Sequence, residues 1–222
     1  MSTYGQFCSF ARALDLLGER WTLLIIRELL CGSRRFSEIR RGIPRISRTM
    51  LAARLRDLAN SGVATRSGAG YELTGSGREL ASTVRELGTW GQRWLPRTLS
   101  REHLDADALL WDMRRRVRVS ELPSDPVVAR IQFTDVRRTG IRFLLLRQSE
   151  VSICSTNPGF PEELRISGSL RTLTAWWRGD LTLAEARAEG MLVEGRREWV
   201  RAFPQWFERY LFAEVAPASE SG

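Results

Sequence analysis

The residues of this 222-residue sequence that could act on another molecule are its arginines. All 34 basic residues are arginine, so their abundance by itself reflects composition and is no evidence for a nucleic-acid partner. Their distribution is more informative. Positions 1–97 carry 16 arginines and 8 acids, whereas positions 98–222 carry 18 of each, so the whole net charge of +8 lies in the first part. Positions 34–56 hold eight arginines and one acid, which favours a polyanionic partner.

The stretch 46–62 (ISRTMLAARLRDLANSG) predicts a short helix inside this basic cluster. Ser47 is a favoured N-cap residue, and Gly62 is a favoured residue after a helix C-terminus. An apolar stripe at i, i+4 and i+7 predicts which face is buried: Leu51, Leu55 and Leu58.

The opposite face of this helix mixes arginines with small residues. Small side chains let a helix approach a DNA groove closely, and arginine can bind guanine or phosphate. A solvated charged face is the alternative interpretation. Together with neighbouring arginines, the residues expected to contact DNA are Arg34, Arg35, Arg45, Ser47, Arg48, Thr49, Ala52, Ala53, Arg56 and Arg66.

The surrounding pattern predicts the elements that position this helix. Helices are expected over 7–17, 21–30 and 36–42, and a short turn then leads into the helix at 46–62, which is a helix-turn-helix order. Short strands at 63–66 and 71–74 predict a hairpin directly afterwards, in the place of a wing.

A long helix follows from about Gly77 to Leu95, with one stripe of apolar and small residues: Leu80, Val84, Leu87, Gly91 and Trp94. This stripe could pack on its own domain. We favour pairing with the same helix of a second subunit, because a domain of this size needs a partner for so long a stripe.

The second part of the chain predicts an α+β domain. A helix at 105–119 precedes strands at 127–135, 140–147 and 150–155, which suit an antiparallel meander, and a further strand at 163–167. Helices are then expected at 170–177, 183–189 and 198–212, separated by 179–180 and 190–195. The expected domains are 1–97 and 98–213, with a disordered tail at 214–222.

Residues 8–95 resemble the HxlR-type winged helix-turn-helix transcriptional regulators. The resemblance is carried by the Gly-x-x-Trp-Thr of Gly18, Trp21 and Thr22, by the turn at 32–36, and by Ile46-Ser47. It extends to the Leu-Thr-x-x-Gly run at 73–77. It implies a homodimeric repressor or activator that binds double-stranded DNA.

The same resemblance bears on Cys8, because the family commonly has a cysteine before its first helix and some members use it to sense oxidants. Here Ser9 replaces the usual proline, and no lysine or histidine lies nearby in sequence to lower the thiol pKa. We therefore favour an inert structural cysteine, with oxidant sensing by Cys8 as the alternative.

Residues 170–207 resemble the C-terminal part of the sterol-carrier-protein-like fold. The resemblance implies a domain that can enclose a small apolar effector between its sheet and helices. For any single aromatic residue, simple core packing is the competing interpretation. The candidates for lining a ligand tunnel are Trp176, Trp177, Trp199, Phe203 and Trp206.

Other kinds of function have little support in the sequence. Cys8, Cys31 and Cys154 have neither disulfide-framework nor metal-ligand spacing, and His103, the single histidine, lies in a polar linker. We therefore expect no enzyme, no metal and no cofactor. The sequence has no signal segment or membrane-spanning run, so we expect a cytoplasmic protein with no membrane partner. The prediction is a dimeric DNA-binding regulator; the alternative is a lipid or isoprenoid carrier bearing a basic domain.

Overall fold

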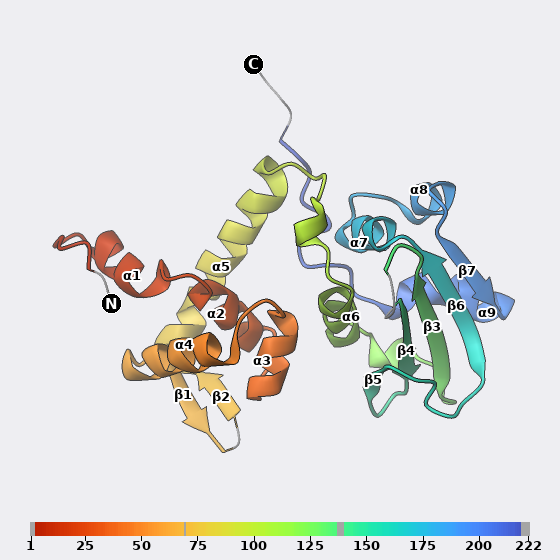
Figure 1. Cartoon of the computed structure of the whole chain (residues 1–222), viewed down its shortest axis with the longest axis horizontal. Coiled ribbons are helices and arrows are strands. Elements are labelled where there is room, and N and C mark those ends of the chain that lie inside the picture. The colour runs from red at the N-terminus through yellow and green to blue at the C-terminus, as the bar shows by residue number, and fades with distance from the viewer. Residues whose placement is uncertain (1–2, 69, 137–139, 219–222) are drawn as a thin grey trace. The chain divides into compact units, whose positions relative to one another are not determined.

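The chain divides into two compact units, Met1–Trp90 and Gly91–Gly222, in a computed structural model (Figure 1). The structure describes residues 3–68, 70–136 and 140–218. Each unit has its own hydrophobic core.

Helices dominate the first unit, and a two-stranded sheet completes it (Figure 1). Its core is formed by the inner faces of α2 and α4 together with the helix and turn between them. Leu51, Leu55 and Leu58 are fully buried, which confirms the predicted stripe. The elements in order are α1 (Ser9–Leu17), α2 (Thr22–Leu30), α3 (Phe36–Gly42), α4 (Arg48–Asn60), β1 (Ala64–Ser67), β2 (Gly70–Leu73) and α5 (Gly75–Trp94).

Helix α5 changes character along its length. Leu80 and Val84 in its first half pack against the core of the first unit, as the own-domain interpretation predicts. Further along, Leu87, Trp90 and Trp94 are 51%, 56% and 59% exposed. The apolar stripe is therefore only half covered within the single chain.

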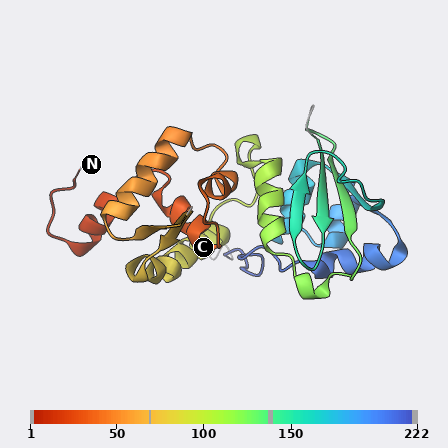
Figure 2. The ribbon, with the colours of Figure 1, turned by 90° about the horizontal axis from the view of Figure 1, so that it is seen from below.

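The second unit is a five-stranded mixed sheet with helices, so the α+β prediction is confirmed, but the expectation of an antiparallel sheet was wrong at one strand pair, β3 with β6. The strand order is β5-β4-β3-β6-β7; β3 and β6 are parallel, and the other neighbouring pairs are antiparallel. One face of the sheet joins α6 and α7 in the main core (Figure 2). The strands are β3 (Val127–Phe133), β4 (Ile141–Leu146), β5 (Val151–Cys154), β6 (Glu162–Gly168) and β7 (Leu192–Gly195). The helices are η1 (Arg101–His103), α6 (Ala106–Arg115), η2 (Val119–Glu121), α7 (Leu170–Arg178), α8 (Leu183–Ala188), α9 (Arg197–Ala202) and η3 (Phe203–Trp206).

Three further expectations for this unit were wrong in detail. The helix predicted over 198–212 ends at Ala202 and continues only as a 3-10 turn, because Pro204 cannot donate a backbone hydrogen bond and its ring obstructs an α-helix. The helix predicted to reach position 119 ends at Arg115. Positions 192–195, taken as a separator, form β7 along the edge of β6.

The end of the chain makes defined contacts as far as it is described. The carbonyl oxygen of Val215 accepts a hydrogen bond from Arg97 Nη2 at 2.6 Å, and the backbone N–H of Ala218 donates to the carbonyl of Arg93 at 2.9 Å. Positions 219–222 of the predicted disordered tail lie outside the described residues.

A matched pair of glycines tests this packing of the chain end. Gly179 and Gly190 both have positive φ, at 78° and 91°. A Cβ at Gly190 would meet nothing within 4 Å, whereas one at Gly179 would lie 2.7 Å from the carbonyl oxygen of Ala213. We expect Gly190→Ala to cost about 1–2 kcal/mol of unfolding free energy from backbone strain. Gly179→Ala should cost about 1–3 kcal/mol more from overpacking. Urea unfolding curves measure both, and equal losses would contradict the packing described here.

Candidate nucleic-acid interface

A buried carboxylate joins α2 to the end of α3. Glu28 is fully buried; its Oε1 accepts a hydrogen bond from Arg27 Nη2 at 2.7 Å, and its Oε2 accepts one from Ser33 Oγ at 3.2 Å. Arg27 Nη2 also donates to the carbonyl oxygen of Gly42 at 3.0 Å. A Cβ at Gly42 would overlap the Glu28 carboxylate, so a larger residue at this crossing would displace that buried side chain. This cluster fixes α3 against α2.

The single acid within the arginine cluster stabilises the start of α3. Glu38 accepts hydrogen bonds from the backbone N–H groups of Arg34 and Arg35, both at 2.9 Å. The N–H of Arg35, the N-cap residue, is one of the donors that a helix N-terminus leaves without an intrahelical partner. Ile43 and Ile46 are then buried in the turn after α3 and set the position at which α4 begins.

The outer face of α4 is solvent-accessible along its length. Arg48, Thr49, Ala52 and Arg56 are exposed, and Ala53 is half-buried. Ser47 Oγ accepts a hydrogen bond from the backbone N–H of Met50 at 3.1 Å, so its hydroxyl caps the helix. Ser47 was also expected to contact DNA, and this capping hydrogen bond occupies one lone pair of its hydroxyl oxygen.

Arg54 is the exception among the arginines of α4, because its side chain is only 15% exposed. It forms an ion pair with Glu19, a second with Asp57 at 3.1 Å, and a hydrogen bond to the carbonyl of Arg20 at 3.3 Å. Arg54 therefore connects α4 to the segment between α1 and α2. Sequence spacing did not indicate this role, because Glu19 lies 35 positions earlier.

The β1-β2 hairpin is attached to the turn before α3. The backbone N–H of Tyr71 donates to the carbonyl of Arg34 at 2.9 Å, and a Cβ at Gly70 would lie 2.8 Å from that oxygen. Arg66 pairs with Tyr71 in the β1-β2 register and is exposed. Arg34 Nη1 donates to the carbonyl of Leu29 at 2.8 Å, so its guanidinium also caps the end of α2.

The predicted DNA-contact residues differ in whether their side chains already take part in the fold. Arg34 and Ser47 have structural hydrogen bonds, whereas Arg35 is an exposed residue at the start of α3. Four further arginines are exposed around α4 and on β1: Arg45, Arg48, Arg56 and Arg66. Within the described part of the chain, no hydrogen bond or ion pair engages their guanidinium groups.

The aromatic residues expected to line a ligand tunnel pack against one another. Trp176 stacks on Phe203 with ring centroids 5.8 Å apart, and Phe203 lies edge-on to Trp206 at 6.3 Å. Trp199 is half-buried and contacts Trp206 at 5.8 Å, while Trp177 donates from Nε1 to Asp112 at 2.8 Å. These five side chains belong to the core of the second unit or pack against it, as the core-packing interpretation predicts.

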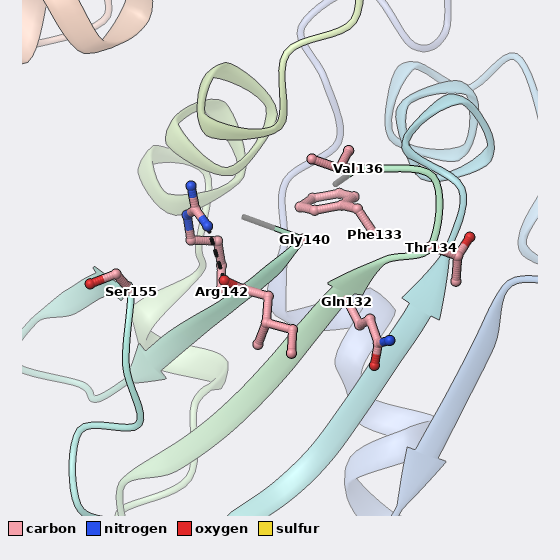
Figure 3. Close-up of a pocket in the computed structure, with 8 residues that line it drawn as sticks. Gln132, Phe133, Thr134, Val136, Gly140, Arg142 and Ser155 are labelled. Atoms are coloured by element: carbon pink, nitrogen blue, oxygen red, sulfur yellow. Dashed lines mark hydrogen bonds between the residues drawn. The ribbon is translucent and has the colours of Figure 1, made fainter. Parts of the chain in front are cut away.

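A separate pocket of about 580 Å³ lies where β3 ends and β4 begins (Figure 3). It is lined by Gln132, Phe133 and Arg142, among others, and Figure 3 shows side chains from both faces of the sheet. Arg142 forms an ion pair with Asp107 of α6 at 2.9 Å and donates to the carbonyl of Ile141 at 3.0 Å. Because an acidic partner already offsets this cation, the pocket does not indicate a particular ligand chemistry.

Cys8 is exposed and precedes α1 as its N-cap residue. The backbone N–H groups of Ala11 and Phe10 at the start of α1 lower the pKa of its thiol. Neighbouring basic side chains in the sequence did not indicate this lowered pKa, because its cause is the helix N-terminus itself.

The described residues contain no group of three or more His, Cys, Asp or Glu side chains arranged to hold a metal ion. No helix among them is both long and apolar enough to cross a bilayer.

Comparison with known proteins identifies the first unit. The HxlR-like helix-turn-helix family matches residues 16–99. YvaP of Bacillus subtilis, an uncharacterised HTH-type transcriptional regulator, is 38% identical over 93 residues, which are 39% of this chain and 86% of YvaP. Mb3122 of Mycobacterium bovis, another uncharacterised HTH-type transcriptional regulator, is 43% identical over 96 residues, which are 40% of this chain and 60% of Mb3122.

Among solved structures, the reduced form of the transcriptional regulator YodB from B. subtilis is 36% identical. The match covers 39% of this chain and 93% of that one, with a TM-score of 0.35. This sequence is 38% identical to YvaP over most of the length of YvaP, and its residues 16–99 match the family. Residues 16–99 are therefore the helix-turn-helix part of this sequence. The chain belongs to the HxlR-like helix-turn-helix family of transcriptional regulators.

Proposed function

We propose that this protein is a sequence-specific DNA-binding transcriptional regulator that reads the major groove with α4 and contacts the backbone with the β1-β2 hairpin as a wing. One observation carries the proposal. Helix α4 buries Leu51, Leu55 and Leu58 completely and presents arginines and small residues outward. A helix of this kind offers guanidinium groups to base edges and phosphates without a steric barrier.

The charge distribution supports DNA as the partner. The excess of eight positive charges lies before position 98, in the part that contains α4 and the hairpin. Arginines that neutralise phosphates release counterions, so affinity should fall steeply with salt. The second unit, residues 91–222, holds 20 arginines and 18 acids, so it adds little to this attraction.

We further propose that the protein pairs with a second copy of itself through the exposed half of α5. The exposed apolar side chains there are Leu87, Trp90, Trp94 and Leu95. Phe7 and Phe10 at the start of the chain are also 99% and 72% exposed, which is costly for large apolar side chains in water. A two-fold dimer would place two copies of α4 on two half-sites of DNA.

Control by a small apolar effector in a sterol-carrier-like second unit stays a prediction. In the present arrangement Trp176, Phe203 and Trp206 are buried against one another, so a ligand would have to separate these rings. Oxidant sensing by Cys8 also stays a prediction. Its exposure and lowered thiol pKa favour reactivity more than its sequence neighbours do.

Different arginines should affect DNA binding in different ways. We expect Arg48→Ala to weaken binding to the selected operator by about 1–3 kcal/mol and to relax its sequence preference. Arg66→Ala in the hairpin should weaken binding to all sequences alike and should reduce the slope of log affinity against log salt by about 1. Fluorescence anisotropy with genomic fragments selected on the wild type, over a salt series, measures both effects. Unchanged operator affinity in an Arg48/Arg56 double mutant would remove α4 from the reading role.

Arg56 and Arg54 provide a matched comparison of the same residue type on the same helix. Arg56→Ala should reduce DNA affinity and change the unfolding free energy by less than about 0.5 kcal/mol, because its side chain is exposed. Arg54→Ala should lower the unfolding free energy by roughly 1 kcal/mol through loss of its pairs with Glu19 and Asp57. Urea unfolding and DNA titration of both variants decide the matter. The reverse pattern would mean that the outer face of α4 has been misassigned.

A further inference from the structure

The last turn of α5, from Gly91 on, belongs to the second unit and makes buried polar contacts within it. Gln92 is only 5% exposed. Its Oε1 accepts a hydrogen bond from Arg178 Nη2 at 2.9 Å, and its Nε2 lies 3.4 Å from Asp180 Oδ1. A buried glutamine in a helix that is otherwise exposed here indicates a specific attachment, because a buried polar group is costly unless it is hydrogen-bonded.

Asp180, two residues after the end of α7, is the centre of this attachment. Its side chain is 9% exposed and lies between two guanidinium groups: Arg97 Nη1 at 3.0 Å from Oδ1, and Arg178 Nε at 3.3 Å from Oδ2. Arg97 also donates to the carbonyl of Val215, which adds the chain end to the cluster. We call Gln92, Arg97, Arg178 and Asp180 the Asp180 clamp.

The clamp and the exposed apolar face lie on opposite sides of the same turns. Trp90 and Trp94 are each two positions from Gln92, about 160° around an α-helix, and both are more than half exposed. Leu95, which follows the last helical residue, is 55% exposed as well. The contacts of Gln92 and Arg97 with Asp180 therefore hold in place the short segment that carries the exposed side chains of Trp94 and Leu95.

We propose that the second unit regulates pairing of two copies of this chain by means of the Asp180 clamp. The inference rests on the proposed dimer through α5. A helix end whose carbonyls lack intrahelical partners frays readily, and the clamp suppresses this fraying. While the contacts of the Asp180 clamp are formed, the last turn of α5 is already ordered in the monomer. Dimerisation through α5 then costs less conformational entropy. Any event in the second unit that moves the end of α7 changes dimer affinity by linkage.

Sedimentation equilibrium of the full chain and three variants tests the proposal. Asp180→Asn should raise the dimer dissociation constant at least tenfold, because Arg97 and Arg178 lose the charge between them. The matched control is Asp107→Asn, which removes another acid of the second unit that pairs with arginine, in this case Arg142, and should change the constant less than twofold. Trp94→Ala reports on pairing through α5 itself and should also weaken the dimer.

Hydrogen exchange of the same samples separates release of the clamp from unfolding. Amides of residues 91–97 should exchange faster in Asp180→Asn, with those of β3 unchanged. If Asp180→Asn also loses protection in β3, Arg97→Gln, which removes contacts from a more exposed side chain, replaces it with the same expectation of a weakened dimer. Wild-type dimer affinity in the clamp variants, with Trp94→Ala weakened, overturns the clamp and leaves the α5 dimer standing. A wild-type dimer dissociation constant in Trp94→Ala overturns both the dimer through α5 and its regulation by the Asp180 clamp.

Discussion

The surface proposed to meet DNA depends on one buried carboxylate. Glu28 lies in the apolar interior of the first unit, where an ionised group is costly unless its oxygens are hydrogen-bonded. Arg27 and Ser33 supply those bonds, and Arg27 extends the cluster to the carbonyl of Gly42 at the end of α3. Since α4 begins six residues after Gly42, the position of α4 follows from this cluster and from the burial of Ile43 and Ile46.

A division of labour among the arginines follows from that arrangement. Arg27, Arg34 and Arg54 have their guanidinium groups bound to carbonyls or carboxylates of their own unit. Their charges add to the positive electrostatic potential of the first unit, while their hydrogen bonds and ion pairs stabilise its fold. Those on the outer face of α4 and on β1 remain available to a polyanion, which explains how one residue type serves both packing and recognition.

Local patterns in the sequence predicted much of the first unit. The cap at Ser47 and the leucine stripe defined α4 because both depend on residues within a few positions of each other. Contacts between distant residues were not predictable in this way. The ion pair of Arg54 with Glu19, the parallel pairing of β6 with β3, and β7 all depend on tertiary placement. The candidate DNA face was therefore located from sequence, whereas the structural role of Arg54 was not.

The most direct test of the central claim places a photoreactive amino acid on α4. Thr49 is exposed on the outer face of α4, and Ser82, exposed on α5, serves as the control position. Full-length protein carrying p-benzoylphenylalanine at either position is irradiated with a genomic fragment selected on the wild type. The account predicts a protein–DNA crosslink from position 49 and none from position 82. Retained binding with no crosslink from position 49, or crosslinks from position 82 alone, would contradict it.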